Sequence, residues 1–243
     1  MSMSTEPSRR IALINPNTTA SMTQLMADCV GAVVDPATEV WAITNQHGPA
    51  SIESHTDEAL AVPGLLEAVR DAESRGADGF VLACFGDPGL DAAREIATGP
   101  VVGIAEAGFH AATMLGRSFS VVTTLARTIG QAEHLVHRYG FADKCRSIYA
   151  CEVPVLELED PASDARKLVV DYCRRAVEED EADSIVLGCA GMADFCHEVS
   201  EQVGVPVIDG VTAGVTFVES LVKLGLRTST RSEYAPPLPK EYR

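Results

Sequence analysis

The chain has little positive charge, few aromatic side chains and no long apolar run. Lys and Arg together number 19 against 35 Asp and Glu, so the formal net charge at pH 7 is -16. Binding to a nucleic-acid backbone or an anionic membrane surface requires clustered basic side chains that displace counterions. No apolar run approaches the roughly 18 residues that a membrane-spanning helix needs. We therefore expect neither a nucleic acid nor a membrane as partner, and a small molecule or another protein is favoured.

Several motifs that would indicate a compartment or a cofactor are also missing. Residues 1–10 are not followed by an apolar segment long enough for a signal peptide. The seven cysteines are odd in number and include no C-x-x-C pair, which fits neither a disulfide framework nor a zinc ribbon. The sequence has no dinucleotide-binding G-x-G-x-x-G after its first strand, no P-loop and no G-x-S-x-G. We expect a cytoplasmic protein with free thiols and no cofactor or metal.

Short β-branched runs alternate with longer amphipathic stretches, which is typical of parallel strands joined by crossover helices. This pattern predicts an α/β fold. The 243 residues, 46% of them hydrophobic, suffice for one large domain or two half-size lobes. The clearest predicted strands are Ile11–Ile14, Gly79–Ala83, Val101–Ile104, Ser120–Thr123, Ser184–Leu187 and Val205–Ile208.

The predicted strands fall into two matching sets. Residues 11–17 correspond to 119–125, residues 76–84 to 181–189, and Gly99-Pro-Val-Val to Val205-Pro-Val-Ile. Chance likeness among α/β strands is the alternative, but the shared order and the repeated Ala-Asp-x-x-Val-Leu-x-Cys favour a duplicated unit. Two lobes related by a pseudo-twofold axis would face each other at equivalent strand ends, where open parallel sheets bind ligands. Cys84 and Cys189 occupy those ends.

Both of these cysteines are followed by a turn and a predicted helix, whose partial positive end lowers the pKa of a nearby thiol. One sulfur could then be a thiolate while the other stays protonated. Such a pair suits racemisation of a carbon acid, in which one group removes a proton and another delivers one to the opposite face. The alternative for either cysteine alone is a buried small hydrophobe. Packing is the role we expect of the other five: Cys29, Cys145, Cys151, Cys173 and Cys196.

Polar residues follow the first predicted strand of each half. Asn17 opens a helix, so it either caps that helix or holds a carbonyl or urea-like group of a ligand. Thr123 and Thr124 occupy the equivalent place in the second half and carry the same two interpretations. Residues 48–57 are polar and rich in turn formers, which predicts a loop that reaches the cleft or its rim. His134 and His137 lie three apart without a third ligand, a spacing more typical of a helix surface than of a metal site.

With these residues assembled, the sequence resembles the aspartate/glutamate/hydantoin racemase superfamily, and within it the hydantoin and allantoin racemases. The likeness runs from about Arg10 to Thr228. Glutamate racemases usually follow their two cysteines with Asn-Thr and Thr-His, whereas this chain has Phe85-Gly86 and Ala190-Gly191, which disfavours an amino-acid substrate. The segments that carry the resemblance are Ile14–Thr19, Pro49–Glu53, Ala83–Leu90, Gly103–Ala107, Val122–Leu125, Leu187–Met192 and Pro206–Val211.

The resemblance implies two pseudo-twofold-related, flavodoxin-like lobes with parallel sheets and the active site in the interlobe cleft. The expected lobes are residues 10–104 with 211–228, and residues 105–210, followed by an extended tail at 229–243. It also implies that Cys84 and Cys189 are catalytic and that the protein is a homo-oligomer. The substrate-binding residues that we predict are Asn17, Ser51, Ile52, Phe85, Gly86, Thr123, Thr124, Ala190, Gly191 and Gly210.

Together, the residues and the resemblance predict an isomerase: a cofactor-independent racemase in which two thiols exchange the C5 proton of a 5-substituted hydantoin. Backbone amides after each cysteine would hold the enolate oxygen. An allantoin racemase, with the same reaction centre and a ureido substituent, is the closest alternative. An alternative of another class is a non-catalytic two-lobed protein that binds a small hydantoin-like molecule, because a fold alone does not establish a function.

Overall fold

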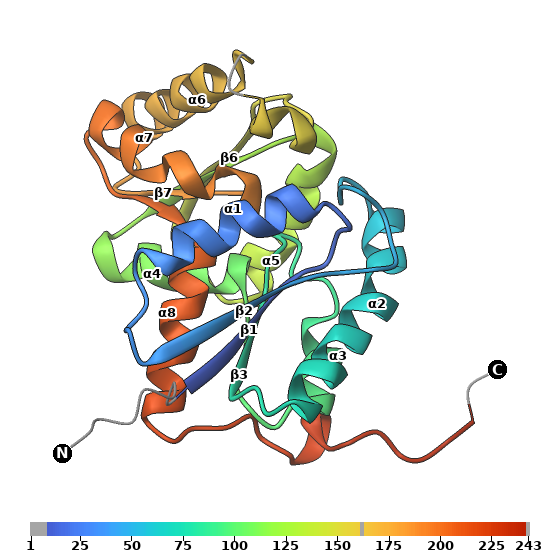
Figure 1. The fold of residues 1–243 in the computed structure, drawn as a ribbon. Coiled ribbons are helices and arrows are strands. Elements are labelled where there is room, and N and C mark those ends of the chain that lie inside the picture. Colours follow the sequence, from blue (N-terminus) through green and yellow to red (C-terminus); the bar gives the residue numbers. More distant parts are fainter. Residues whose placement is uncertain (1–8, 161–162, 242–243) are drawn as a thin grey trace.

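The computed structural model describes residues 9–160 and 163–241, and it contains two four-stranded sheets (Figure 1). Every neighbouring pair of strands is parallel. The predicted α/β fold with two lobes is confirmed. The first sheet has the order β2-β1-β3-β4, with β1 Arg9–Asn15, β2 Thr38–Thr44, β3 Gly79–Leu82 and β4 Val101–Gly103. The second has the order β6-β5-β7-β8, with β5 Phe119–Thr123, β6 Cys145–Ala150, β7 Ile185–Leu187 and β8 Val207–Asp209.

The two sheets repeat each other strand for strand. Substituting β5, β6, β7 and β8 for β1, β2, β3 and β4 reproduces the order of the first sheet in the second. The predicted correspondence of the segments around β1 and β5, β3 and β7, and β4 and β8 is therefore confirmed. The edge strands β2 and β6 were not among the predicted strands. Both are largely half-buried, so neither has the continuous apolar run of a central parallel strand.

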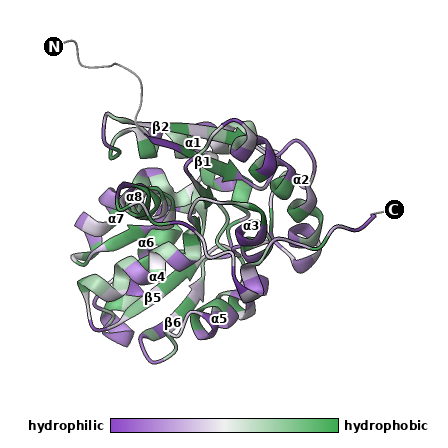
Figure 2. Cartoon of the chain, turned by 90° about the horizontal axis from the view of Figure 1, so that it is seen from below, coloured by the Kyte–Doolittle hydropathy of each residue, from purple (hydrophilic) through white to green (hydrophobic). Residues whose placement is uncertain are grey.

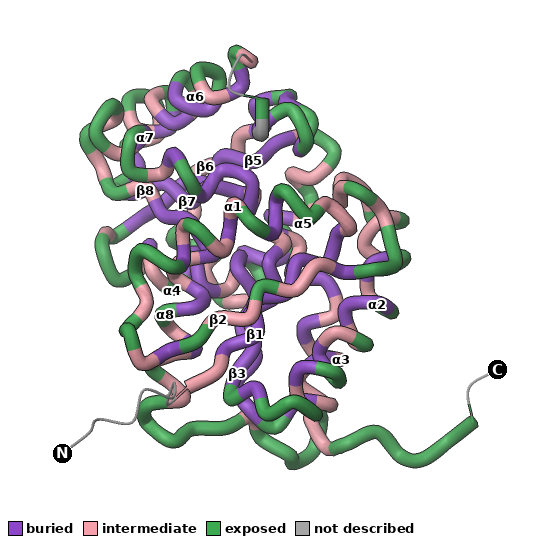
Figure 3. Tube along the Cα trace, in the orientation of Figure 1, coloured by how far each residue is buried: buried purple, intermediate pink, exposed green. Residues whose placement is uncertain are grey.

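Alternate residues of each central strand pack into different cores. In β1, Ile11 and Leu13 pack with α1 (Ala20–Gly31) and α8 (Gly210–Lys223). Ala12 and Ile14 pack with α2 (His55–Ser74) and α3 (Leu90–Ile96). Apolar residues accordingly run along the strands and the inner helix faces (Figure 2), and the central strands are buried on both sides (Figure 3). Because they are buried on both sides, the central strands are continuous apolar runs, which made them predictable from the sequence.

The helices that follow β4 and β8 are exchanged between the lobes. Helix α4 (Ile104–Leu115) leaves the first sheet, yet its Phe109 packs with Phe119 in the core of the second. Helix α8 leaves the second sheet, yet its Val215 packs with residues of β1 and β3 in the core of the first. Helix α8 thus packs against the first sheet, and α4 crosses from the first sheet to the second, to which its C-terminal end leads through β5.

Two glycines let the exchanged helices approach the sheets at equivalent points. A Cβ on Gly108 of α4 would lie 2.8 Å from Cγ1 of Val186, and one on Gly214 of α8 would lie 3.1 Å from Cγ1 of Val81. Val81 and Val186 are corresponding residues of β3 and β7. In both halves, therefore, a glycine in the helix allows it to pack closely against the same position of the central strand.

The second lobe is completed by α5 (Ile129–Arg138), α6 (Ala165–Asp180), α7 (Cys196–Val203) and the short 3-10 helices η1 (Ala126–Thr128), η2 (Val155–Glu159) and η3 (Ala190–Phe195). After α8, a further 3-10 turn, η4 (Ser232–Tyr234), sits against α3, where the Tyr234 hydroxyl donates to Asp91 at 3.1 Å. In the part of the chain that the structure describes, no helix has both the length and the apolar character to cross a membrane. The exact lobe boundaries stay a prediction.

Candidate active site

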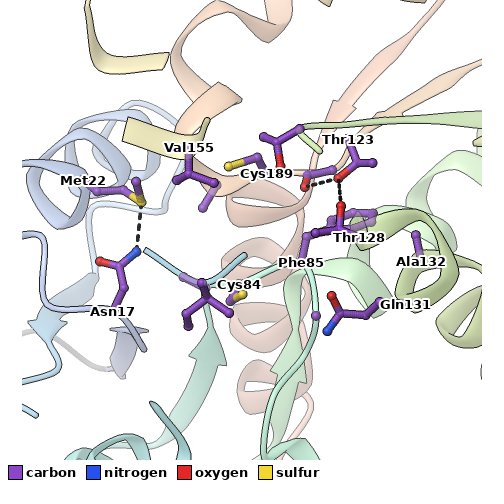
Figure 4. Close-up of a pocket in the computed structure, with 16 residues that line it drawn as sticks. Asn17, Met22, Cys84, Phe85, Thr123, Thr128, Gln131, Ala132, Val155 and Cys189 are labelled. Atoms are coloured by element: carbon purple, nitrogen blue, oxygen red, sulfur yellow. Dashed lines mark hydrogen bonds between the residues drawn. The ribbon is translucent and has the colours of Figure 1, made fainter. Parts of the chain in front are cut away.

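A small cavity of about 50 Å³ lies where the carboxyl ends of the two sheets meet (Figure 4). Cys84 enters it from the segment after β3, and Cys189 enters it from the segment after β7. The structure thus brings together the two thiols that the sequence singled out, one from each lobe. The remaining lining residues are Asn17, Met22, Ile52, Ala83, Phe85, Gly86, Thr123, Thr124, Thr128, Gln131, Ala132, Val155, Gly188 and Ala190.

The turn that carries Cys84 is held by its own backbone and by a buried carboxylate. The N–H of Asp87 donates to the carbonyl oxygen of Cys84 at 2.9 Å. The Asp87 side chain accepts the N–H groups of Ala105 and Glu106, both at 3.0 Å, and the hydroxyl of Tyr139 at 2.7 Å. Burial nevertheless raises the pKa of Asp87 from 3.8 to about 6. The turn after Cys84 is therefore fastened both to the start of α4 and to the second lobe.

Cys189 occupies the matching place but heads a different local structure. It is the N-cap residue of η3, and its carbonyl oxygen accepts the N–H of Met192 at 3.1 Å. The backbone amide of Gly191 interacts with the Cys189 thiol, just as the amide of Gly86 interacts with the Cys84 thiol. Each sulfur therefore faces a backbone N–H two residues further along the chain.

The expected lowering of the two thiol pKa values is wrong. Burial is the largest influence and raises the pKa of Cys189 from 9.0 to about 12, while the amide of Gly191 only partly opposes it. Burial raises the pKa of Cys84 further, and the nearby carboxyl of Glu58 adds to the rise. The helix dipole is too weak here because α3 begins only at Leu90 and η3 is a short 3-10 helix.

Asn17 lines the cavity and holds the turn before α1, whose N-cap residue is Thr19. Its Oδ1 accepts the N–H of Thr19 and the side-chain amide of Asn15, both at 2.9 Å. Because a backbone N–H can only donate, Oδ1 must face Thr19 and Nδ2 must face the cavity. That Nδ2 donates to the sulfur of Met22 at 3.3 Å, which is a weak acceptor. The expectation that Asn17 caps the helix is therefore wrong, because its Oδ1 bonds the N–H of the N-cap residue instead of a helix N–H, while its Nδ2 is available to a ligand.

Thr123 and Thr124 line the cavity from the second lobe of the protein. The hydroxyl of Thr123 lies 3.2 Å from that of Thr128 and 3.3 Å from the carbonyl oxygen of Gly188. Thr128 itself donates to the carbonyl oxygen of Leu125 at 2.8 Å and so closes the first turn of η1. The side chain of Thr123 accordingly joins β5, β7 and η1 at the point where Cys189 emerges.

Most of the other predicted contact residues surround the same cavity. Ile52, Phe85, Gly86 and Ala190 line it. Three do not: Ser51 precedes Ile52 in its loop, Gly191 presents only its amide to Cys189, and Gly210 begins α8 tightly against the backbone of Ile104.

A family model described as Asp/Glu/Hydantoin racemase matches residues 11–218. The chain belongs to this family. It is 45% identical over 233 residues to a hydantoin racemase of Pseudomonas sp. (strain NS671), covering 96% of this chain and 94% of the relative. It is 47% identical to a hydantoin racemase of Rhizobium meliloti, covering 93% and 94%. A solved allantoin racemase from Klebsiella pneumoniae superposes with a TM-score of 0.95 at 49% identity, covering 97% of this chain and 96% of that one.

Family membership makes the protein a racemase and hence an isomerase. The alternative of a binding protein without turnover is therefore set aside. Among residues 9–160 and 163–241 of this racemase, no group of three or more His, Cys, Asp and Glu could hold a metal ion. His134 and His137 are both exposed on α5, as their spacing predicted.

Sequence reasoning missed the parts of the racemase site that come from distant helices. Val155 of η2 lines the cavity, and its N–H donates to Oε1 of Glu53 at 2.9 Å, which ties the 48–57 loop to the second lobe. Gln131 of α5 lines it as well and donates to Glu58 of α2. Glu53 ends the Pro49–Glu53 segment that carries the family resemblance, and its carboxylate was the signal that could have pointed to a partner such as the N–H of Val155. Gln131 had no signal, because its neighbours in sequence are those of an ordinary amphipathic helix.

Proposed function

We propose that the protein is a two-thiol racemase of 5-substituted hydantoins that exchanges the proton at C5. The observation that supports this most strongly is that Cys84 and Cys189, at equivalent strand ends of different lobes, line one cavity. Similarity to the hydantoin racemases adds the hydantoin ring as the substrate class. We include in the proposal a cytoplasmic homo-oligomer, as expected from the sequence.

In the proposed reaction, the thiolate of one cysteine removes the proton from C5. The electron pair of the broken C–H bond passes into the adjacent ring carbonyl and forms an enolate. The thiol of the other cysteine then donates its proton to the opposite face of C5, so the two sulfurs end with their protonation states exchanged. The amides of Gly86 and Gly191 and the Nδ2 of Asn17 are donors suited to the transient negative charges.

Allantoin is the second candidate substrate. The likeness to the Klebsiella pneumoniae allantoin racemase favours it. Allantoin is itself a hydantoin with a ureido group at C5, so the same thiols and the same ring contacts serve both substrates. The two candidates differ only in what the cavity must hold beyond C5.

The test replaces each thiol separately. We expect Cys84→Ser and Cys189→Ser to lower the rate of racemisation at least ~1,000-fold, because a serine hydroxyl is too weak a base without an activating partner. Polarimetry on single-enantiomer hydantoins and on allantoin measures the loss. Cys145→Ser is the matched control, since Cys145 is half-buried but lies outside the cavity lining.

Isotope exchange in deuterated water separates the two roles. Each single variant that retains exchange should introduce deuterium into one enantiomer with retention of configuration, and the favoured enantiomer should differ between the variants. Racemisation by either variant at more than about a tenth of the normal rate would show that the two thiols are not the acid–base pair.

A further inference from the structure

A glutamine with a fixed amide orientation stands at one end of the cavity. Gln131 lies on α5 of the second lobe, and its Nε2 donates to Oε1 of Glu58, which lies on α2 of the first lobe. A carboxylate can only accept hydrogen bonds, so the amide nitrogen must point to Glu58 and the amide oxygen is left for the cavity. Gln131 thus presents an acceptor beside the two thiols.

The turn after Cys84 is shaped around this pair. A Cβ on Gly86 would lie 2.7 Å from Nε2 of Gln131 and would also collide with the Glu58 carboxylate. A side chain at position 86 would therefore displace the ends of both side chains from their present places. Glycine at position 86, two residues after Cys84, thus leaves room for the Gln131 amide beside the reacting centre.

The stereochemistry of the proposed reaction limits which part of the substrate can lie beside Gln131. Protons leave and arrive along a line through the two sulfurs, on opposite faces of C5. The planar enolate must then lie across that line, and its ring and its C5 substituent point in opposite directions from C5. Figure 4 shows Asn17 and Gln131 on opposite sides of the pair of thiols. One of these side chains therefore faces the ring and the other faces the substituent.

Polarity settles which end holds the ring. Nδ2 of Asn17 is a donor whose present partner is only a thioether, so it suits a ring carbonyl that becomes an enolate oxygen. The oxygen of Gln131 would repel that developing charge, but it suits an N–H donor. Alkyl and aryl substituents have no N–H group, and a ureido substituent has three.

We infer that Gln131 is a specificity-determining residue that selects a C5 substituent carrying N–H donors, so that 5-ureidohydantoin, allantoin, is preferred to 5-alkylhydantoins. This inference rests on the proposed function and refines its substrate. An alkyl substituent in the same place would offer the amide oxygen no donor and would displace any water bound to it, and that unmet bond disfavours the alkyl substrate. Glu58 acts through Gln131 as a positioning residue, because it holds the amide in this orientation.

The experiment measures kcat/KM for allantoin and for 5-isopropylhydantoin with the same protein sample. We expect Gln131→Leu to lower the ratio of allantoin to 5-isopropylhydantoin by about tenfold, the equivalent of one hydrogen bond. Glu58→Gln should lower it by a smaller factor, since the Gln131 amide is then free to turn over. Gln24→Leu is the matched control, because Gln24 also donates to a carboxylate, that of Asp28 at 2.8 Å, on the exposed face of α1.

A ratio of two substrates in one sample does not respond to partial unfolding, which changes both rates together. If the unaltered protein racemises neither compound, the proposed function fails. If it racemises both and Gln131→Leu leaves their ratio within twofold of the control, the proposed function stands and the inference about Gln131 is overturned.

Discussion

The two lobes cap their exchanged helices in different ways. In the second lobe, Asp209 is the N-cap of α8, and its own side chain accepts the N–H of Val211 at 2.7 Å and that of Thr212 at 3.2 Å. In the first lobe, the corresponding N-cap of α4 is Gly103, which has no side chain to offer. Asp87, from the turn after Cys84, supplies the missing carboxylate from a distance. A side chain at Gly103 would collide with it.

This difference shows how a repeated fold can acquire unequal halves. The cap of α8 is local and could be lost without disturbing Cys189. The cap of α4 belongs to the same turn as Cys84, so the start of a helix and the position of a thiol depend on one carboxylate. Tyr139 of the second lobe joins the same carboxylate, and no equivalent tyrosine bond to Asp209 is found among the described residues.

The largest expected effect is that removing the two caps has unequal consequences. Asp87→Ala leaves buried donors on α4 and Tyr139 without an acceptor, so the free energy of unfolding should fall by about 3 kcal/mol. Its kcat should also fall at least about tenfold, because the Cys84 turn loses its tether and a small misplacement of a reacting group is costly. Asp209→Ala should cost about 1–2 kcal/mol and leave kcat within twofold. Urea unfolding and steady-state rates below both melting temperatures measure these effects, and equal loss of kcat in both variants would contradict the contrast.

The thiols themselves should differ in reactivity. Burial raises the pKa of both, but two carboxyls, those of Glu58 and Asp87, raise that of Cys84 further, whereas Cys151 and a single carboxyl, that of Glu53, add to the rise for Cys189. Alkylation by iodoacetamide requires the thiolate, so its rate should rise about tenfold per pH unit from 7 to 10 without a plateau. Cys189 should react faster than Cys84 throughout. Peptide mass spectrometry gives both rates in one sample, and a plateau near neutral pH would contradict the direction of both pKa shifts.

The smallest effect concerns the tyrosine that links Asp87 to the second lobe. The folded-state pKa of Asp87, about 6, lies above its usual 3.8, so the folded protein binds this proton more tightly than the unfolded chain. Its contribution to the free energy of unfolding is therefore greatest below about pH 4, declines as pH rises to about 6 and is constant above that. Tyr139→Phe removes a bond that lowers this pKa, so the decline should extend to higher pH and stability at pH 7 should fall by about 1 kcal/mol.

Urea unfolding between pH 4 and pH 8 tests the tyrosine prediction. The matched control is Tyr149→Phe, which removes a hydroxyl that donates to Asp180 at 2.6 Å near the surface. An identical pH dependence in Tyr139→Phe and the unaltered protein would show that the bond to Asp87 does not shift its titration.

The sequence predicted what depends on continuous burial. The central strands are apolar on both faces, and the repeated segment ending in Cys84 and Cys189 identified the equivalent strand ends. It did not reveal the edge strands β2 and β6, whose exposed positions interrupt the apolar pattern. The sequence also did not predict that Gln131 and Val155 line the cavity, because they reach it only through packing between the lobes.

The thiol pKa values show a second property that the sequence could not predict. Position before a helix is visible in a sequence, but the depth at which a side chain is buried and the sign of the charges around it are not. For Cys84, both of those hidden quantities oppose the dipole. The spacing therefore located the sulfur correctly and gave the wrong direction for its titration.

The exchange of α4 and α8 has a consequence for how the chain could be divided. The first sheet is covered on one face by α8, which is covalently attached only to the second sheet, whereas α4 lies between β4 and β5 and is joined to both sheets. A fragment ending after β4 would keep its strands but lack the α8 residues that fill the core beside Leu13 and Val81. In the complementary fragment, the apolar face of α8 would lack the strands of the first sheet against which it packs. The first half therefore depends on a helix that the second half supplies, as one subunit of a swapped dimer depends on its partner.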